Sequence, residues 1–419
     1  MSIYPPVAIN GCASRCAQAP PVTVDIALRY GEVASTWDRL IPDSHFFLKK
    51  DWLEAVENAT PHDMRLLYLS FSQNGRVVGA AACQIQRFRA SESLASVQNT
   101  QDTQCALRNI AQWLSRKVAA NFKTDLIVCG NLLLTGEHGF YFDPSLVTEE
   151  EAASMLDQGI RAASQRLQSQ GLRASVWLVK DILPRRVAFC KTLCDAGFTQ
   201  FRIQPNMRMK LPLGSFEEYL EAMSAKYRAN LKRALNKRRD IQTEELNLER
   251  LESLKAPMYA LYAQVAGDAG FNMVRLRDDY FWVLKNKMGA GFRVWGYFAK
   301  GRLLGFFSAI RHGKTMEAHF LGYEKAENAR YQLYLNMLIE LARKALEDRC
   351  SELVFGRTAL EIKSSVGAEP EDYLCFIRSQ NPLANKFAKP VFECLVPKVV
   401  WKQRHPFRKS GEASPLEIG

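Results

Sequence analysis

The sequence lacks the signatures of several common protein classes. No stretch of its 419 residues reaches the roughly 18 apolar residues that a membrane-spanning helix needs. The first 22 residues contain no apolar run beside basic residues, as a secretory signal would. No glycine pattern matches a P-loop, a dinucleotide-binding loop or a nucleophile elbow in its strand-to-helix context. We therefore expect a cytoplasmic protein without a transmembrane segment, and we exclude these three kinds of active site.

The ten cysteines do not have the spacing of a metal site. Cys12 with Cys16, and Cys190 with Cys194, lack a second pair or a histidine at the separation that zinc sites show. Most cysteines lie inside apolar segments, where a reduced thiol packs as a small hydrophobic side chain. We expect no bound metal and no tightly bound cofactor.

Length and composition predict two folded domains. The chain has 47% hydrophobic and 24% charged residues, which is enough to bury a full core. The turn Pro212-Leu213-Gly214, followed by Ser215 and Glu218 at capping-box spacing, separates two halves with a similar order of elements. We predict a poorly ordered leader (1–22), an N-terminal domain (23–211), a C-terminal domain (212–400) and a basic tail (401–419).

The formal net charge is +12, and basic residues gather in two places. Such clusters attract phosphate groups, whether from a nucleotide-containing donor, a tRNA or an anionic membrane surface. The alternative for the first cluster is a helix face that is only solvated. The first cluster comprises Lys226, Arg228, Lys232, Arg233, Lys237, Arg238 and Arg239, and the second comprises Lys398, Lys402, Arg404, Arg408 and Lys409.

The first half alternates strands and helices. Asn74-Gly75 between two apolar segments is a strong hairpin signal. Thr148 is a helix cap, and the three glutamates after it favour the positive end of the helix dipole. The predicted order is a helix (50–58), strands (65–72 and 76–86), a helix (104–121), a strand (125–129), a helix (148–170), a strand (173–179), a helix (184–196) and a strand (200–211).

The second half begins with helices and continues with antiparallel strands. Lys300-Gly301 marks the turn of an apolar hairpin, and a polar loop precedes an amphipathic helix. The predicted order is a long basic helix (216–239), helices (254–267 and 277–288), strands (292–299, 302–311 and 315–323), the polar loop (324–330), a helix (331–348), and a buried strand that ends at Phe355.

The strand 315–323 differs from its neighbours because one face is polar. Alternation places Thr315, Glu317, His319 and Leu321 on one face and the residues between them on the other. Glu317 and His319 could supply a general base for an incoming amine, since both side-chain types can be tuned towards a neutral pKa. The alternative is a half-exposed strand with polar residues on its solvent side.

Four segments of the second half stand out together: Lys226 to Arg233, the apolar hairpin, the helix 331–348, and Phe355-Gly356-Arg357 followed by Ile362-Lys363 and Gly367-Ala368. Together they resemble the GNAT acyltransferases of the Fem-like and CelD-like branch. The resemblance covers about residues 215–378, and the first half shares only the order of elements. It implies an α/β (α+β) fold of two tandem GNAT-like domains, each a mixed, largely antiparallel sheet flanked by helices.

The resemblance also implies where an acyl donor binds. In GNAT enzymes the loop before the central helix offers backbone amides to the pyrophosphate of coenzyme A, because a helix amino terminus has unpaired N–H groups and a positive dipole end. Here that loop lacks the family's glycines, which let a backbone wrap tightly around a diphosphate. The donor-binding candidates are Asn328, Arg330, Tyr331 and Gln332 in the loop, with Arg357 and Lys363 after the next strand.

Two further sets of residues have a chemical and a structural interpretation. Tyr323 is a candidate proton donor to a leaving thiolate, although aromatic residues near a helix start more often pack. Lys363 is alternatively a surface residue of a short helix. In the first half, Gly136-Glu137-His138-Gly139 lets a ligand approach the backbone, and Glu137 and His138 are candidates for binding the acceptor. The alternative is a tight turn at a strand end.

The sequence leaves more than one function open. The first is an N-acyltransferase with acyl-CoA as co-substrate and a small-molecule or precursor amine as acceptor. The second is a Fem-type transferase that takes an aminoacyl group from tRNA to a cell-envelope precursor, which the basic helix and the missing glycine loop favour. The third is a degenerate, non-catalytic pair of domains that recognises such a precursor or an anionic surface.

Overall fold

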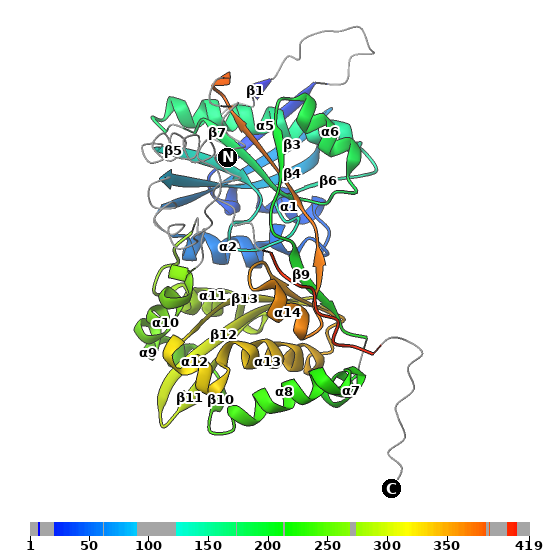
Figure 1. Cartoon of the computed structure of the whole chain (residues 1–419). Helices are drawn as coiled ribbons and strands as arrows, with labels where there is room; N and C mark the ends of the chain where they lie inside the picture. The colour runs from blue at the N-terminus through cyan, green and yellow to red at the C-terminus, as the bar shows by residue number, and fades with distance from the viewer. Residues whose placement is uncertain are drawn as a thin grey trace, which may run out of the picture. The chain divides into compact units, whose positions relative to one another are not determined.

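The structure is a computed structural model that describes residues 7–8, 21–61, 63–89, 123–172, 174–212, 214–268, 274–382, 385 and 400–408. The chain forms two compact units, each with its own sheet (Figure 1). Unit 1 takes its residues from 1–204, 266–288 and 372–398, and unit 2 from 205–265, 289–371 and 399–419. The predicted helix 104–121 and most of the predicted leader lie outside the described residues.

Unit 1 is built on a sheet in the order β1-β2-β3-β4-β5-β7-β16-β8, with β6 beside β4. β5 and β7 run parallel, whereas the other pairs in the described part of this sheet run antiparallel. The strands are β1 (Val7–Ala8), β2 (Val22–Ala27), β3 (Met64–Gln73), β4 (Arg76–Arg89), β5 (Lys123–Cys129), β6 (Phe140–Phe142), β7 (Val176–Ile182), β8 (Thr199–Arg202) and β16 (Leu374–Ser379).

Local sequence explains the main elements of unit 1. Asn74 and Gly75 both have positive φ, as a two-residue hairpin turn requires, so the predicted hairpin is present. Thr148 and Glu151 form a reciprocal capping box at the start of α5. Gly159 lets α5 approach β3, because a Cβ there would lie 2.6 Å from the ring of Phe71. The helices are α1 (Ala34–Leu40), α2 (Lys50–Ala59), α5 (Glu149–Ser169), α6 (Val187–Asp195) and α11 (Tyr280–Met288).

Unit 2 is built on a sheet in the order β10-β11-β12-β13-β14-β9-β15, in which β13 and β14 form a parallel pair. Its strands are β9 (Asn206–Lys210), β10 (Gln242–Glu245), β11 (Phe292–Ala299), β12 (Arg302–His312), β13 (Thr315–Tyr323), β14 (Glu352–Gly356) and β15 (Glu369–Glu371). Its helices are α7 (Phe216–Ala222), α8 (Ala225–Lys237), α9 (Leu248–Ser253), α10 (Lys255–Asp268, which begins in this unit), α12 (Lys325–Tyr331), α13 (Leu333–Glu347) and α14 (Leu360–Ser365).

The core of unit 2 lies between its sheet and α13. This amphipathic helix packs on β12, β13 and β14, and α7 and α8 pack on α13 (Figure 1). α10 approaches the sheet at Gly322, where a Cβ would lie 2.5 Å from the backbone nitrogen of Tyr262. In the described part of the chain, no helix is long and apolar enough to cross a membrane.

Each sheet contains a strand from the other half of the sequence. The segment predicted as one strand, 200–211, forms two strands in different sheets, β8 in unit 1 and β9 in unit 2. Pro205 lies between them and has no N–H to continue a ladder. β16, which follows nearly all of unit 2 along the chain, returns to unit 1 and pairs with β7 and β8. The compact units therefore interleave along the sequence, in contrast to the predicted sequential ranges 23–211 and 212–400.

Two predicted elements of the second half are corrected by the structure. The long helix 216–239 is broken, because Met223 has an extended ψ of 150° and forms a β-bridge with Phe407. Ser224 then begins α8 as its N-cap residue. The predicted polar loop 324–330 is mostly helical, as α12, and it ends at Gln332 in the left-handed conformation.

Candidate functional site

The parallel strands of unit 2 separate partway along their length. β13 pairs with β14 from Thr315 with Glu352 to Glu317 with Val354, and the recorded pairing of these two described strands stops there. β13 nevertheless continues to Tyr323, held by β12 on its other edge. Its backbone from Ala318 onward is thus unpaired with β14, so a ligand could hydrogen-bond to that edge.

A β-bulge lies in the separated part of β13. His319 and Phe320 together face Ser308 of β12, since Ala318 pairs with Ala309 and Leu321 with Phe307. The predicted strict alternation of 315–323 is therefore wrong beyond Ala318. Met316, Ala318, Leu321 and Tyr323 all pack against the core that contains α13, whereas the ring of Phe320 contacts Tyr262 of α10.

Glu317 is a buried acid at the point where the two strands separate. Its neighbours Met316 and Ala318 face α13, so Glu317 points to the opposite face, and it is only 5% exposed. Burial raises the pKa of Glu317 above its ordinary value, and the nearby His312 partly opposes this. The Nε2 atom of His312 lies 3.6 Å from Oε1 of Glu317. The carboxyl group and the imidazole therefore lie close together, just beyond hydrogen-bond distance.

His319 lies among aromatic side chains. Its ring centroid is 4.5 Å from that of Phe320 and 5.9 Å from that of Phe292. Burial lowers the pKa of His319 to about 3, because the charged imidazolium loses its hydration there. His319 is therefore neutral at physiological pH and a much weaker base than the predicted relay would need.

An ionic cluster lies along the same face of the sheet as Glu317. Arg208 of β9 is the register partner of Val354, which is the partner of Glu317. The guanidinium of Arg208 is 3.0 Å (Nε) from one oxygen of Glu352 and 2.7 Å (Nη1) from Glu371. The exchanged strand β9 thus brings a positive charge close to the buried acid.

The junction between α12 and α13 occupies the place predicted for the donor loop. Gln332 has a φ of 49°, although it is not glycine, and within the described residues its buried Oε1 has no hydrogen-bond partner. Asn328 accepts a hydrogen bond from the Tyr334 amide at 3.1 Å and so caps α13. Tyr331 is buried, while the exposed guanidinium of Arg330 lies over its ring. The sequence thus replaces the family's glycines with a left-handed glutamine and an asparagine cap.

Lys363 is buried, which contradicts its interpretation as a surface residue. Its Nζ donates hydrogen bonds to the carbonyl groups of Gly356, at 3.2 Å, and Arg357. Burial, together with the charge of Arg357, lowers the pKa of Lys363 to about 7. The amine fixes a loop in which Gly356, Thr358 and Ala359 all have positive φ. A β-branched residue such as Thr358 rarely adopts this conformation, so the loop is strained and depends on Lys363.

Tyr323, the predicted proton donor, belongs to an aromatic pair. The rings of Tyr323 and Tyr334 lie 5.9 Å apart, at the end of β13 and the start of α13. Both pack partly against the core of unit 2. Burial raises the pKa of Tyr334, which keeps its hydroxyl protonated. Both rings have the packing role that the sequence left open, and Tyr323 lies six residues along β13 from Glu317, on the opposite face of the strand.

The two acceptor candidates lie in unit 1, on the loop between β5 and β6. Glu137 forms an ion pair with Arg186, which also contacts Glu149 at 2.7 Å. Burial raises the pKa of Glu137, and Arg186 opposes this rise. The ring of His138 lies 4.5 Å from that of Phe47. Glu137 is thus bound into an ionic network, and its role in acceptor binding stays a prediction.

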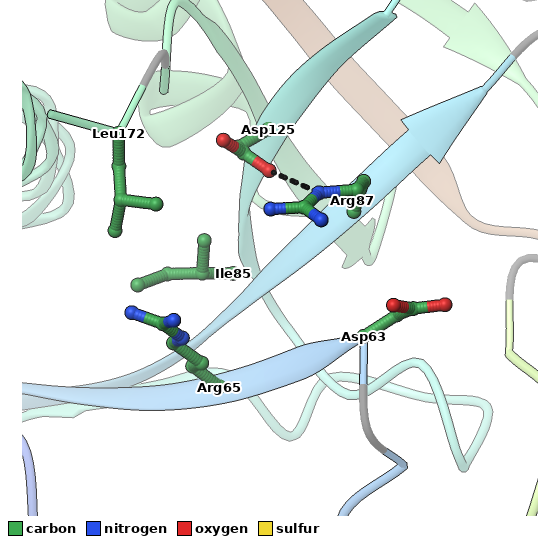
Figure 2. A pocket seen from close by; sticks show the side chains of 6 residues that line it. All are labelled: Asp63, Arg65, Ile85, Arg87, Asp125 and Leu172. Atoms are coloured by element: carbon green, nitrogen blue, oxygen red, sulfur yellow. Dashed lines mark ion pairs between the residues drawn. The ribbon is translucent and has the colours of Figure 1, made fainter.

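Unit 1 also has a cavity of about 110 Å³ at the start of β3 and β5. Figure 2 shows the side chains that line it, with Arg87 paired to Asp125 at 3.5 Å. Arg65 and Arg87, the two arginines of the lining, are exposed. Ile85 and Leu172 form the apolar part of the lining. The cavity is at the opposite end of β5 from the loop that holds Glu137.

His312 and Arg208 are site residues that the sequence did not indicate. His312 lay outside the predicted strand 302–311, and only the register of β12 with β13 brings it close to Glu317. Arg208 belonged to a strand predicted for the other domain. A histidine three residues before a strand that carries a buried acid was the one available signal.

Comparisons with known proteins identify the domain that contains this site. Residues 225–369 match the family described as "Acetyltransferase (GNAT) domain". The fold is similar to FemX, with a TM-score of 0.50 and 12% identity over 81% of this chain and 94% of that one. It is also similar to a tandem GNAT protein from the clavulanic acid biosynthesis pathway, with a TM-score of 0.50 and 11% identity over 86% and 99% of the two chains. No curated protein matches the sequence. The predicted fold of two GNAT-like domains, each with a mixed sheet, is confirmed.

Proposed function

We infer that this chain is an acyltransferase of the GNAT superfamily, in its Fem-like and CelD-like branch, and that it joins the acyl group of an acyl-CoA to an amine. The observation that carries the proposal is the separation of β13 from β14 beside the first turn of α13. An extended acyl-pantetheine arm can pair with β13 along the edge where its pairing with β14 has ended. The first turn of α13 offers amides and the positive end of a dipole to the donor's phosphates.

The residues of unit 2 can supply the proton transfers of this reaction. The amine attacks the thioester carbonyl carbon, a C–N bond forms, and the C–S bond breaks. Glu317, with its raised pKa and its contact to His312, accepts the proton that the amine loses. The protonated Glu317 then gives this proton to the departing thiolate, because Tyr323 lies six residues further along β13 and packs on the opposite face of the sheet. Backbone N–H groups at the edge of β13 stabilise the oxyanion, and the reaction needs no side-chain nucleophile.

The donor is supported by the charges around α13. Arg330 is exposed at the end of α12, and the first turn of α13 contains no acidic residue. Lys363 acts on the donor indirectly, because its amine holds the loop after β14. The acceptor is proposed only as a primary amine.

A thermal-shift and calorimetric comparison tests the donor. Acetyl-CoA and longer acyl-CoAs are expected to raise the melting temperature, since a ligand that binds only the native state stabilises it. Arg330→Ala should reduce this shift, whereas Lys344→Ala, at the other end of α13, is the matched control. Acyl-CoAs that leave the melting temperature unchanged at millimolar concentration would exclude this donor.

One observation favours a second donor, an aminoacyl-tRNA. α8 packs on α12 and α13 and exposes a row of cations: Lys226, Lys232, Arg233 and Lys237, with Arg239 just beyond. Among the described residues, none of these cations has an acidic partner within ion-pair distance. A row this long exceeds what a single coenzyme A needs. Affinity for tRNA that falls steeply with salt, and falls further in Lys232→Glu, would favour this donor over acyl-CoA.

A further inference from the structure

Both units contain the same local arrangement, in which a helix joins two parallel strands. In unit 1 it is β5, α5 and β7, and in unit 2 it is β13, α13 and β14. We propose that the chain holds a single donor site, in unit 2, and that the equivalent place in unit 1 is closed to any phosphate-bearing donor. This inference rests on the proposed function and adds the number and location of donor sites.

Charge separates the two helix starts. α5 begins with Glu149, Glu150 and Glu151, and its capping box with Thr148 already uses the amide of Glu151. These carboxylates neutralise the positive end of the dipole and repel an approaching phosphate. α13 has no acidic residue in its first turn, and a neutral amide side chain from Asn328 caps it. A diphosphate is therefore attracted to α13 and repelled from α5.

The backbone also differs between the two units at these places. In unit 1, β5 stays paired with β7 up to Cys129, its last residue, so it offers no unpaired edge beyond the ladder. The chain then turns back, so that Gly139 lies against the backbone of Gly130. The contact is close enough that a Cβ on Gly139 would lie 2.6 Å from the nitrogen of Gly130. In unit 2, by contrast, β13 continues past its last pair with β14 as far as Tyr323.

Side chains from β7 hold this turn of unit 1 in place. The Gly136 amide donates to the buried carboxylate of Asp181 at 3.0 Å. The Nζ of Lys180 donates to the carbonyl of Leu134 at 2.9 Å and pairs with Asp181. The loop between β5 and β6 thus fills the space beside the end of β7. Opening it for a ligand would break these two hydrogen bonds between the loop and β7.

Coenzyme A itself, which cannot transfer an acyl group, is the probe for the test. Native mass spectrometry and titration calorimetry on the full chain should give one coenzyme A per chain. Asn328→Asp keeps the cap on the Tyr334 amide but adds the negative charge that α5 carries, so it should weaken binding at least tenfold. Glu150→Gln removes an exposed charge from α5 and should leave both stoichiometry and affinity unchanged. If Asn328→Asp does not fold, Arg330→Glu makes the same test at the surface.

The possible results separate this inference from the proposed function. Binding of two coenzyme A molecules per chain would overturn the proposal of a single site in unit 2. So would one bound coenzyme A whose affinity is the same in Asn328→Asp and Arg330→Glu as in the wild type. Either result would still be consistent with an acyl-CoA donor. A second site that appears in Glu150→Gln would show that charge alone closes unit 1, and it would overturn the role given to the loop. No binding to the wild-type chain would refute the acyl-CoA donor and the site assignment together.

Discussion

Replacing Lys363 by methionine should change how the stability of unit 2 depends on pH. Methionine keeps an aliphatic chain in the buried site but removes the amine that bonds to the carbonyl groups of Gly356 and Arg357. Because burial lowers the pKa of Lys363 from 10.5 to about 7, the native and unfolded chains bind a different number of protons between these values. In this window the unfolded lysine is charged and the native one is neutral.

The sign and size of the change in the free energy of unfolding with pH follow from this difference in bound protons. Below about pH 7 the amine is protonated in both states, and folding bears the full cost of burying the charge. As pH rises towards 10.5, the free energy of unfolding of the wild type should increase by about 1.4 kcal/mol per pH unit relative to Lys363→Met. From pH 7.5 to 9.5 the difference between the two proteins should therefore change by about 2.7 kcal/mol. At 4% exposure the lysine is little screened by solvent.

Urea unfolding at pH 7.5, 8.5 and 9.5, followed by tryptophan fluorescence, measures this difference. Lys344→Met is the matched control, because the Lys344 amine bonds to Glu347 at the helix end instead of lying in the core. Its stability difference from the wild type should stay constant over the same range. A constant difference for Lys363→Met as well would mean that its pKa is not lowered, and the buried-amine account of the loop would be wrong.

The other predictions concern catalysis, donor binding and the exchanged strand. Glu317→Gln should lower kcat by about 100-fold with donor affinity nearly intact, and His319→Ala should lower it less; unchanged turnover in both would leave these residues a structural role. Since the pKa of His319 is lowered to about 3, Glu317→Gln should have the larger effect. Arg330→Ala should weaken donor binding by about 1 to 2 kcal/mol in calorimetry without unfolding the chain, and an equal affinity would remove it from the site. Arg208→Met leaves Glu352 and Glu371 without their shared cation and should lower the free energy of unfolding by about 2 kcal/mol. An unchanged free energy of unfolding would mean that β9 is held by its strand pairing alone.

The sequence predicted those parts of the fold that depend on near neighbours. Asn74-Gly75 indicated its hairpin because those residue types tolerate positive φ. Thr148 and Glu151 indicated the start of α5 because both caps lie within one turn. Long-range features were not predictable in this way. The exchange of β9 and β16 depends on pairing between segments far apart in the chain, and no local pattern encodes it.

The candidate site was predicted in outline and changed in detail. Glu317 was found from alternation, which holds as far as Ala318, but the bulge at His319 comes from the mismatch with β12 and left no mark in the residue pattern. Lys363 was found by resemblance and expected to contact the donor, whereas its amine faces backbone carbonyls. His312 could not be found because its partner is defined by strand register. Which residues touch the substrates stays a prediction.

The exchanged strands also set the order in which the chain can finish folding during synthesis. β8 ends at Arg202, and its recorded partner in the described sheet, β16, begins only at Leu374. A ribosome that adds roughly 5 to 20 residues per second needs on the order of 10 to 35 seconds to make the intervening chain. During that time the edges of β7 and β8 that await β16 are open to wrong partners, as unpaired strand edges are. Unit 1 is thus begun first and completed last, and a nascent chain stalled within unit 2 should depend on chaperones to stay out of aggregates.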